Sequence, residues 1–325
     1  MAHHQPPNTL SEVLQLMSDS QTTVKSALLF PGQGAQFVGM GKELYAELPA
    51  VKDLFDRAES ILGINIKQLC FEGPADALEA TDISQPAIFL ASLAALESLK
   101  ATRPELLESI QGAAGLSLGE YTALVFSGAM DFETGLRVVR ERGRVMQAAA
   151  VASPSGMTSL LGLDEAKVDH VIEQVAPHGR LWKANMLGPG NIVISGEKQA
   201  LAHVEGPALE AGAMKVIPLA VAGAFHSPLM KPADDQLGAV LAASTIHTPR
   251  IPVYANVDTS VHTTPDEIRQ RLVAQVTGGV LWEGCIRRMM ADGYTQFYEV
   301  GPGRVLTGLL KRIDRKVPCE TIPAR

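Results

Sequence analysis

Gly115-Leu116-Ser117-Leu118-Gly119-Glu120 is the stretch that decides the fold, because it follows an apolar, strand-like run and leads directly into a helical pattern. A serine between glycines at a strand-to-helix turn is typical of a nucleophile elbow, where small flanking residues let strand and helix approach closely and leave the hydroxyl exposed. Free N–H groups at a helix start favour negative charge, so Leu118 can offer its N–H to an oxyanion. The alternative interpretation is a glycine-rich turn that happens to contain a serine.

Composition places the chain among globular proteins. Its 325 residues are 46% hydrophobic and 19% charged, which suffices for one large core or for one core with a subsidiary domain. No apolar run approaches the length of a membrane span, and a formal charge of -7 argues against nucleic acid or an anionic membrane surface as the main partner. Cysteines 70, 285 and 319 have no metal-ligand spacing, so we expect no metal site and a cytoplasmic protein.

The first 25 residues are polar, and Lys25 is their only lysine or arginine. They resemble neither a signal peptide nor a basic transit peptide. We expect residues 1–25 to form a flexible N-terminal arm or a short helix around Thr9 to Met17.

Beyond this arm, apolar runs of strand type alternate with helical runs, which predicts an α/β protein. Before residue 153 we expect strands at 26–30 and 110–116, a helix at 41–62 with a break at Pro49, a helix at 85–99, and a helix from 132 to about 150 that Asp131 caps. After residue 220 we expect strands at 252–255 and 295–300, helices at 228–243, 265–275 and 282–292, and a last helix after Gly301-Pro302-Gly303.

The segment between these two parts has a different pattern. We expect strands at 157–163, 181–185, 191–195 and 214–219, with helices at 164–175 and 198–211. The resulting order, β-α-β-β-α-β, predicts a ferredoxin-like unit inserted into the larger domain. The predicted boundaries are 26–152 and 221–325 for the catalytic domain and 153–220 for the insertion.

A serine nucleophile needs a base, and His226 is the histidine in the most suitable place. It follows a run of small apolar residues and precedes Ser227-Pro228, on a loop where the chain re-enters the large domain. A satisfied structural histidine is the alternative interpretation. We set the other seven aside as residues of the arm, of polar faces and loops of the insertion, or of turns: His3, His4, His170, His178, His203, His247 and His262.

No aspartate stands out as the third member of a hydrolase triad. Asp234 and Asp235 lie within the next predicted helix, and Asp258 follows a strand, where a solvated turn is the expected role.

Seven motifs, taken together and in this order, identify the chain as similar to a known family. They are Phe30-Pro-Gly-Gln33-Gly-Ala-Gln36, the elbow, Arg140-Glu-Arg142-Gly-Arg-Val-Met-Gln147, Gly223-Ala-Phe-His226-Ser, Asn256-Val-Asp258, Ala274-Gln275 and Tyr298-Glu-Val-Gly-Pro-Gly-Arg-Val-Leu-Thr307-Gly. On these motifs the chain resembles the malonyl-CoA:acyl carrier protein transacylases, the free-standing acyltransferases of type II fatty acid synthesis. The resemblance covers nearly everything after Ser26 and implies an α/β-hydrolase-like core with a ferredoxin-like insertion.

The resemblance also implies a role for each matching residue. Ser117 would be the acylated nucleophile and His226 its base, while Gln275 would orient His226 through its main-chain carbonyl, so that no aspartate is required. The oxyanion hole would combine the N–H groups of Leu118 and Gln33. Residues 31–34 can also be interpreted as a simple tight turn, and because no Lys-Ser/Thr follows their glycines, we expect no nucleotide and no cofactor.

Arg142 carries the substrate prediction. A guanidinium on the helix after the elbow can hold a carboxylate with two parallel N–H bonds, whereas an acetyl group would leave it unpaired. We expect its neighbours Arg137, Arg140 and Arg144 to form a solvated face. Two positions depart from the family pattern. Leu116 stands where many bacterial relatives have histidine, and Asn185-Met-Leu187 departs from Asn-x-Asn, so a substrate contact is expected of Asn185 only.

The resemblance implies ping-pong transfer of a malonyl group from malonyl-CoA to the phosphopantetheine thiol of acyl carrier protein. We expect the protein to be a monomer. Because such carriers are usually acidic, docking requires basic residues, for which the candidates are Arg287, Arg288, Lys311, Arg312 and Arg315. A trans-acting malonyl acyltransferase of a polyketide synthase would use the same residues. An α/β-hydrolase esterase would need an acid partner for His226 and would have no use for Arg142.

Overall fold

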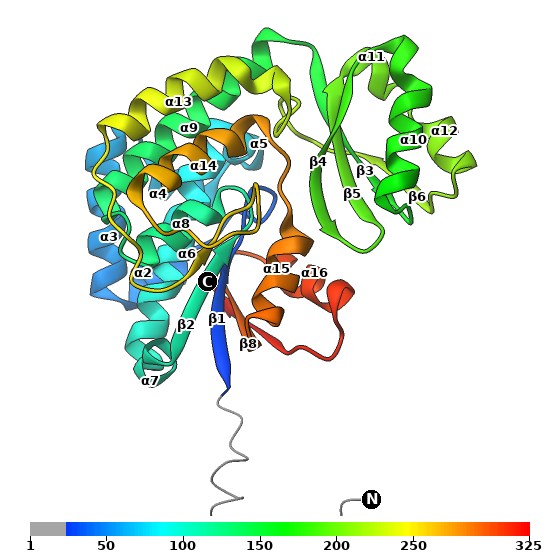
Figure 1. Ribbon diagram of the computed structural model, residues 1–325. Helices are drawn as coiled ribbons and strands as arrows, with labels where there is room; N and C mark the ends of the chain where they lie inside the picture. Colours follow the sequence, from blue (N-terminus) through cyan, green and yellow to red (C-terminus); the bar gives the residue numbers. More distant parts are fainter. Residues whose placement is uncertain (1–23) are drawn as a thin grey trace, which may run out of the picture.

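The computed structural model of the protein describes residues 24–325 (Figure 1). Most of the predicted N-terminal arm, including the helix at Thr9 to Met17, lies outside the described residues. The first strand of the described residues begins at Lys25.

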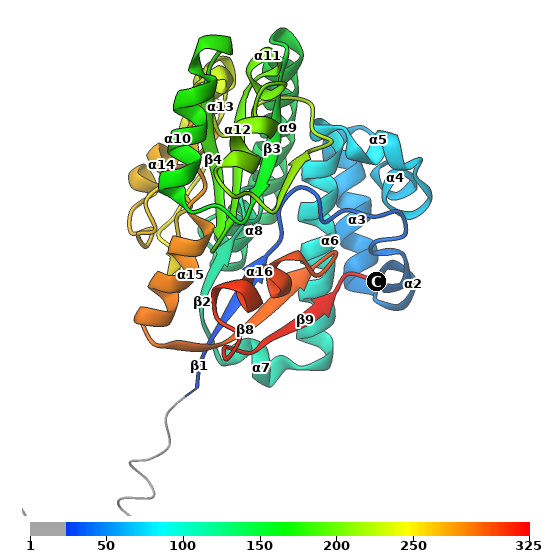
Figure 2. The same cartoon turned by 90° about the vertical axis from the view of Figure 1, so that its right-hand side faces the viewer.

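A five-stranded parallel sheet forms the centre of the larger unit. Its strands are β1 (Lys25–Phe30), β2 (Ile110–Gly115), β7 (Val253–Tyr254), β8 (Tyr294–Gly301) and β9 (Cys319–Pro323), in the order β7-β2-β1-β8-β9. Phe30 lies opposite Gly115 in the parallel register, so the loops that follow β1 and β2 leave the sheet side by side. Figure 2 shows β1, β8 and β9 next to one another, with α16 in front of β8 and α15 to the left of the three strands.

Helices cover both faces of this sheet. Because successive side chains of a strand point to opposite faces, alternate side chains of β1 pack into two different cores. Leu28 and Phe30 belong to the larger core, whereas Ala27 and Leu29 pack with α15 and α16. The helices are α2 (Lys42–Glu47), α3 (Pro49–Leu62), α4 (Ile66–Glu72), α5 (Ala75–Glu79), α6 (Thr81–Thr102), α7 (Pro104–Glu108), α8 (Gly119–Phe126), α9 (Phe132–Ala152), α13 (Lys231–Ala243), α14 (Pro265–Thr277), α15 (Trp282–Ala291) and α16 (Val305–Ile313), with a 3₁₀ turn, η2, at Pro228–Met230.

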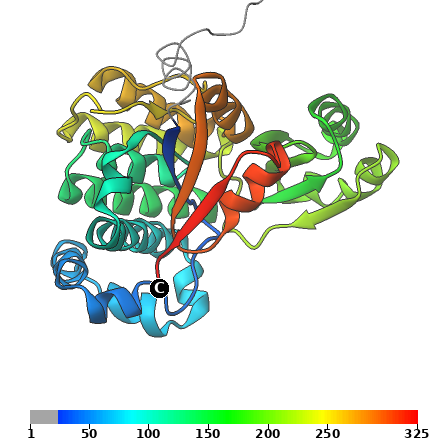
Figure 3. The same cartoon turned by 90° about the horizontal axis from the view of Figure 1, so that it is seen from below.

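A separate antiparallel sheet projects to one side of the parallel sheet (Figure 3). Its strands are β3 (Ser155–Leu161), β4 (Leu181–Gly188), β5 (Asn191–Glu197) and β6 (Lys215–Pro218), in the order β4-β5-β3-β6. They carry α10 (Glu165–Val175), the 3₁₀ turn η1 (Ala176–His178), α11 (Lys198–Leu201) and α12 (Glu205–Glu210). The predicted order β-α-β-β-α-β is confirmed, but the single helix predicted at 198–211 is wrong. Pro207 cannot donate an N–H and would clash with the preceding turn, so two helices form instead.

Main-chain and side-chain hydrogen bonds attach this sheet to the larger unit. Asn185 in β4 bridges to Val280, and Met186 N–H donates to Val280 O at 2.9 Å. On the other side, Ser195 Oγ in β5 donates to Phe225 O at 2.5 Å. The fold is therefore a mixed α/β structure with a parallel and an antiparallel sheet. Within residues 24–325, no helix combines the length and apolar character that crossing a membrane requires.

Candidate active site

Ser117 occupies a strained turn between β2 and α8. Its φ of 49° is in the left-handed region that residues other than glycine seldom adopt. The flanking glycines are needed for space: a Cβ on Gly115 would lie 1.9 Å from the carbonyl carbon of Gly119, and one on Gly119 would lie 2.0 Å from Phe30 O. Asn256 holds the turn, because its Oδ1 accepts from Ser117 N–H at 2.7 Å and its Nδ2 donates to Gly115 O at 2.8 Å.

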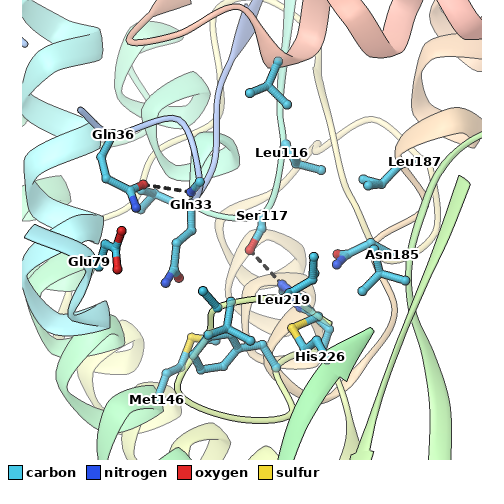
Figure 4. A pocket seen from close by; sticks show the side chains of 18 of the residues that line it. Gln33, Gln36, Glu79, Leu116, Ser117, Met146, Asn185, Leu187, Leu219 and His226 are labelled. Carbon is cyan, nitrogen blue, oxygen red and sulfur yellow. Dashed lines mark hydrogen bonds between the residues drawn. The ribbon is translucent and has the colours of Figure 1, made fainter. Parts of the chain in front are cut away.

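His226 lies beside the serine, although 109 positions separate them in the chain. Ser117 Oγ is 2.8 Å from His226 Nε2 (Figure 4), and His226 Nδ1 is 2.7 Å from Gln275 O. A carbonyl oxygen can only accept, so Nδ1 carries the hydrogen and Nε2 is free to accept the serine proton. Burial, with a smaller contribution from the charge of Arg142, lowers the pKa of His226 to about 4. The imidazole is therefore neutral near pH 7 and can act as a base.

The antiparallel sheet holds the loop that presents His226. Ser195 bonds to Phe225 O, and Ser155 Oγ accepts from Ala224 N–H at 3.1 Å. A Cβ on Gly223 would lie 2.6 Å from the Cβ of Ala150 in α9, so only glycine lets the loop pass this helix. His226 itself has a φ of 58°, which places a second strained residue at the site.

Gln33 and Leu118 line the same cavity as Ser117. The turn that contains Gln33 lies against the elbow, because Leu116 N–H donates to Phe30 O at 3.0 Å and a Cβ on Gly32 would lie 2.4 Å from Leu116 O. Neither Gln33 N–H nor Leu118 N–H has an acceptor among residues 24–325. Both residues line the cavity at Ser117, where free donors can stabilise a developing oxyanion.

Arg142 is a buried cation that forms no ion pair with any residue from 24 to 325. Its side chain is 1% exposed, its Nη1 donates to Gln85 Oε1 at 2.7 Å, and its Nη2 lies 2.9 Å from Gln275 Oε1 and 3.0 Å from Ser117 Oγ. Its Nε has no hydrogen-bond partner, and within residues 24–325 no carboxylate oxygen lies within 4.0 Å of the guanidinium. Burial lowers the pKa of Arg142. A buried guanidinium with neutral partners favours an anionic ligand.

The arginines around Arg142 differ in part from the prediction. Arg137 and Arg144 are exposed, as expected of a solvated face. For Arg140 the prediction is wrong, because this side chain is partly buried and its Nη1 donates to Asp82 O at 2.8 Å. Helices α6 and α9 approach closely here, since a Cβ on Gly143 would lie 2.9 Å from Thr81 O.

The cavity at Ser117 has a volume of about 460 Å³. Figure 4 shows Asn185 and Leu187 of β4 on one side of the serine, with Gln33 and Glu79 on the other. The remaining lining is largely apolar and includes Leu116, Met146, Met157, Val193, Leu219, Val221, Phe225, Val305 and Leu309. In the described chain, no cluster of three or more His, Cys, Asp or Glu side chains could hold a metal ion.

Sequence reasoning missed three residues behind the site: Glu120, Asn256 and His262. Glu120 is fully buried and accepts from Asn256 N–H at 2.9 Å, from Gln275 Nε2 at 2.8 Å and from His262 Nε2 at 2.8 Å. His262, which was set aside as the base because it stands among turn residues, has a side chain that is buried beside Glu120. Glu120 and Asn256 belong to motifs quoted above, but a motif does not reveal whether its polar residues are buried.

Comparison with known proteins gives one consistent result. A model of the acyl transferase domain family matches residues 27–322. The chain is 43% identical over 296 residues to a malonyl CoA-acyl carrier protein transacylase of Bacillus subtilis, covering 90% of this chain and 92% of the relative. It is 39% identical over 290 residues to the enzyme of that name from Escherichia coli strain K12, covering 88% and 92%.

Solved structures agree with the sequence relatives. An acyl-carrier-protein-S-malonyltransferase from Bartonella henselae superposes with a TM-score of 0.88 at 37% identity, covering 92% of this chain and 95% of that one. A type II PKS acyl-carrier protein in complex with its malonyl-transacylase gives a TM-score of 0.86 at 36% identity, covering 92% and 95%.

Proposed function

Because the chain belongs to the acyl transferase domain family, with malonyl CoA-acyl carrier protein transacylases as its relatives, we infer that it moves a malonyl group from malonyl-CoA to acyl carrier protein. It is an acyl-carrier-protein S-malonyltransferase that supplies fatty acid synthesis. The observation that supports a carboxylated acyl group most directly is Arg142, a buried guanidinium that forms no ion pair with any residue from 24 to 325 and lies 3.0 Å from Ser117 Oγ.

In the first half-reaction, Ser117 Oγ attacks the thioester carbonyl of malonyl-CoA while His226 Nε2 takes the hydroxyl proton. The N–H groups of Gln33 and Leu118 bind the tetrahedral oxyanion, and Arg142 binds the malonyl carboxylate. The C–S bond then breaks, His226 returns the proton to the coenzyme A sulfur, and a malonyl-serine ester remains. In the second half, the phosphopantetheine thiol of the carrier attacks this ester, and the same groups act in reverse. Asn185, which faces the serine across the cavity, contacts the substrate.

Arg142→Ala tests this assignment. We expect the rate of malonyl transfer to fall at least about tenfold, because the substrate carboxylate loses its partner in a desolvated cavity. Acetyl transfer should change little or increase, since no unpaired guanidinium remains. The measurement is the ratio of transfer rates from malonyl-CoA and acetyl-CoA at one ionic strength.

Arg144→Ala is the matched control, because Arg144 is exposed and, among residues 24–325, its side chain bonds only to Glu141 and Gln236. The ratio of malonyl to acetyl transfer rates in this variant should equal that of the wild type. An unchanged ratio in Arg142→Ala would remove this residue from the substrate site.

The structure reduces the five candidate residues for carrier docking to three. Arg287 pairs with Glu283 and Arg288 with Asp292, so their charges are largely compensated. Lys311, Arg312 and Arg315 are exposed and form no ion pair with any residue from 24 to 325. Lys311 and Arg312 lie in the last turn of α16, the helix whose Val305 and Leu309 line the cavity. We propose that an acidic carrier docks at this end of α16.

Charge reversal distinguishes these two groups of residues. Arg312→Glu should raise the KM for acyl carrier protein by about threefold to tenfold and leave acylation by malonyl-CoA unchanged, because only the second half-reaction uses the carrier. Arg287→Glu, which removes a compensated charge, should change the KM less. Equal effects of the two variants would place the carrier elsewhere.

Several finer assignments are also proposals. The strand-turn-helix elbow supports an α/β-hydrolase-like domain formed by residues 26–152 and 221–325, and the strand order supports a ferredoxin-like insertion at 153–220. Three free cysteines support a cytoplasmic protein, and light scattering tests the proposed monomer.

One observation speaks against an esterase: His226 Nδ1 faces the main-chain carbonyl of Gln275 and not an acidic side chain. Rates on fatty-acid and polyketide carriers test the proposal against a polyketide-loading role.

A further inference from the structure

Glu120 lies directly behind the catalytic serine, in the first turn of α8. Its carboxylate is fully buried and receives donors from three separate parts of the chain. Oε2 accepts from Asn256 N–H at 2.9 Å and from Gln275 Nε2 at 2.8 Å, while Oε1 accepts from His262 Nε2 at 2.8 Å. The steps described above give this carboxylate no contact with the reacting atoms. It does contact residues that hold the serine, the histidine and the arginine.

The Gln275 amide has one allowed orientation, and Glu120 is a main reason for it. Gln275 Nε2 faces three oxygens without hydrogens: Glu120 Oε2 at 2.8 Å, Ser117 O at 3.0 Å and Asn256 Oδ1 at 3.3 Å. Rotating the amide by half a turn would place its own oxygen against these acceptors. The unrotated amide directs Oε1 to Arg142 Nη2 at 2.9 Å. Glu120 therefore determines that Arg142 contacts the amide oxygen of Gln275 and not its amide nitrogen.

This arrangement orients Arg142 without neutralising it. The protein atoms that accept from the guanidinium are the amide oxygens of Gln85 and Gln275 and the hydroxyl of Ser117. A carboxylate in place of either amide would form an ion pair with Arg142 and occupy donors that a substrate carboxylate needs. With Gln275 between them, the negative charge of Glu120 acts on the guanidinium from one residue away, in surroundings where charges are weakly screened.

We propose that Glu120 is a positioning residue for acyl selectivity: through Gln275 it holds Arg142 charged, oriented and open to the carboxylate of a malonyl group. The proposal rests on the proposed role of Arg142 in binding that carboxylate. It also assigns a role to His262, because His262 Nε2 bonds to Glu120 Oε1 and thereby holds the carboxylate in place. Selectivity is then set partly by a residue that the substrate does not contact.

Glu120→Gln is the test. The new amide keeps the shape of the side chain, removes the charge, and must direct a donor toward Gln275 or His262. We expect kcat/KM for malonyl-CoA to fall tenfold or more, mainly through KM, while acetyl transfer changes less than threefold. Glu299→Gln is the matched control. Glu299 is equally buried, but it accepts from Leu306 N–H and Thr307 N–H at the start of α16, so this variant should retain the wild-type ratio of malonyl to acetyl rates.

The outcomes separate this inference from the proposed function. A wild type without preference for malonyl, or an Arg142→Ala variant that keeps the preference, would contradict the proposed function itself. Where both behave as expected, equal losses on both substrates in Glu120→Gln, or no loss on either, would overturn the positioning role alone. If Glu120→Gln does not fold, His262→Asn removes one donor and keeps the carboxylate. It should lower the ratio at least twofold, and an unchanged ratio would likewise overturn the positioning role.

Discussion

Ser117→Ala is expected to reduce malonyl transfer by a factor of about 10³ or more, the largest effect of any single change in this chain. The serine hydroxyl is the nucleophile that His226 Nε2 reaches at 2.8 Å, and alanine offers no replacement. The fold should persist, because the Asn256 side chain holds the elbow through the main-chain atoms of Gly115 and residue 117, which the substitution leaves in place. The measurement is the rate of transfer to acyl carrier protein, together with the thermal unfolding midpoint.

Ser127→Ala provides the matched control for this variant. Ser127 follows the same helix, and its buried Oγ donates to Leu124 O at 3.0 Å, away from the cavity. It should retain wild-type transfer. Transfer that survives in a folded Ser117→Ala variant would mean that the nucleophile lies elsewhere.

His226→Ala is expected to slow acylation by about a hundredfold or more, because a serine hydroxyl is a poor nucleophile without a positioned acceptor. The pH profile gives a second signature. The pKa of His226 is lowered from 6.5 to about 4, so the neutral, basic form persists to lower pH. Wild-type acylation should therefore be lost only as pH falls through about 4, and the variant should lack this titration.

His247→Ala is the control for this series, because His247 is exposed on the segment between α13 and β7. It should leave both the rate and the profile unchanged. A comparable loss from His247→Ala, or an acidic limb near 6.5 in the wild type, would contradict the assignment of His226 as a base with a strongly lowered pKa.

Local chemistry explains which parts of the fold were predictable. Glycines on both sides of Ser117 indicate the elbow, because their spacing reflects a close approach of neighbouring backbones. The alternation of strand and helix patterns likewise indicates the parallel sheet and the inserted unit. Strand β9 was missed because Cys319–Pro323 is short and partly exposed, and it is held by pairing with β8 rather than by a pattern of its own.

The site was predictable only where a motif carried the residue. Ser117, His226 and Arg142 stand in motifs, and Ser117 Oγ lies within hydrogen-bonding distance of both His226 and Arg142. The network of Glu120, His262 and the Gln275 side chain joins residues up to 155 positions apart. Burial of such polar groups depends on tertiary packing, so hydrophobic periodicity cannot reveal it. The prediction limited Gln275 to its main-chain carbonyl, although its side chain contacts both Arg142 and Glu120.

Mass spectrometry after brief incubation with malonyl-CoA tests the central claim most directly. The intact protein should gain one malonyl group, the adduct should map to Ser117, and addition of acyl carrier protein with its phosphopantetheine arm should remove it. The Ser117→Ala variant should gain nothing. An adduct that maps to another residue, an adduct that survives in Ser117→Ala, or a wild-type protein that transfers malonyl without ever carrying it would contradict a malonyl-serine intermediate at this elbow.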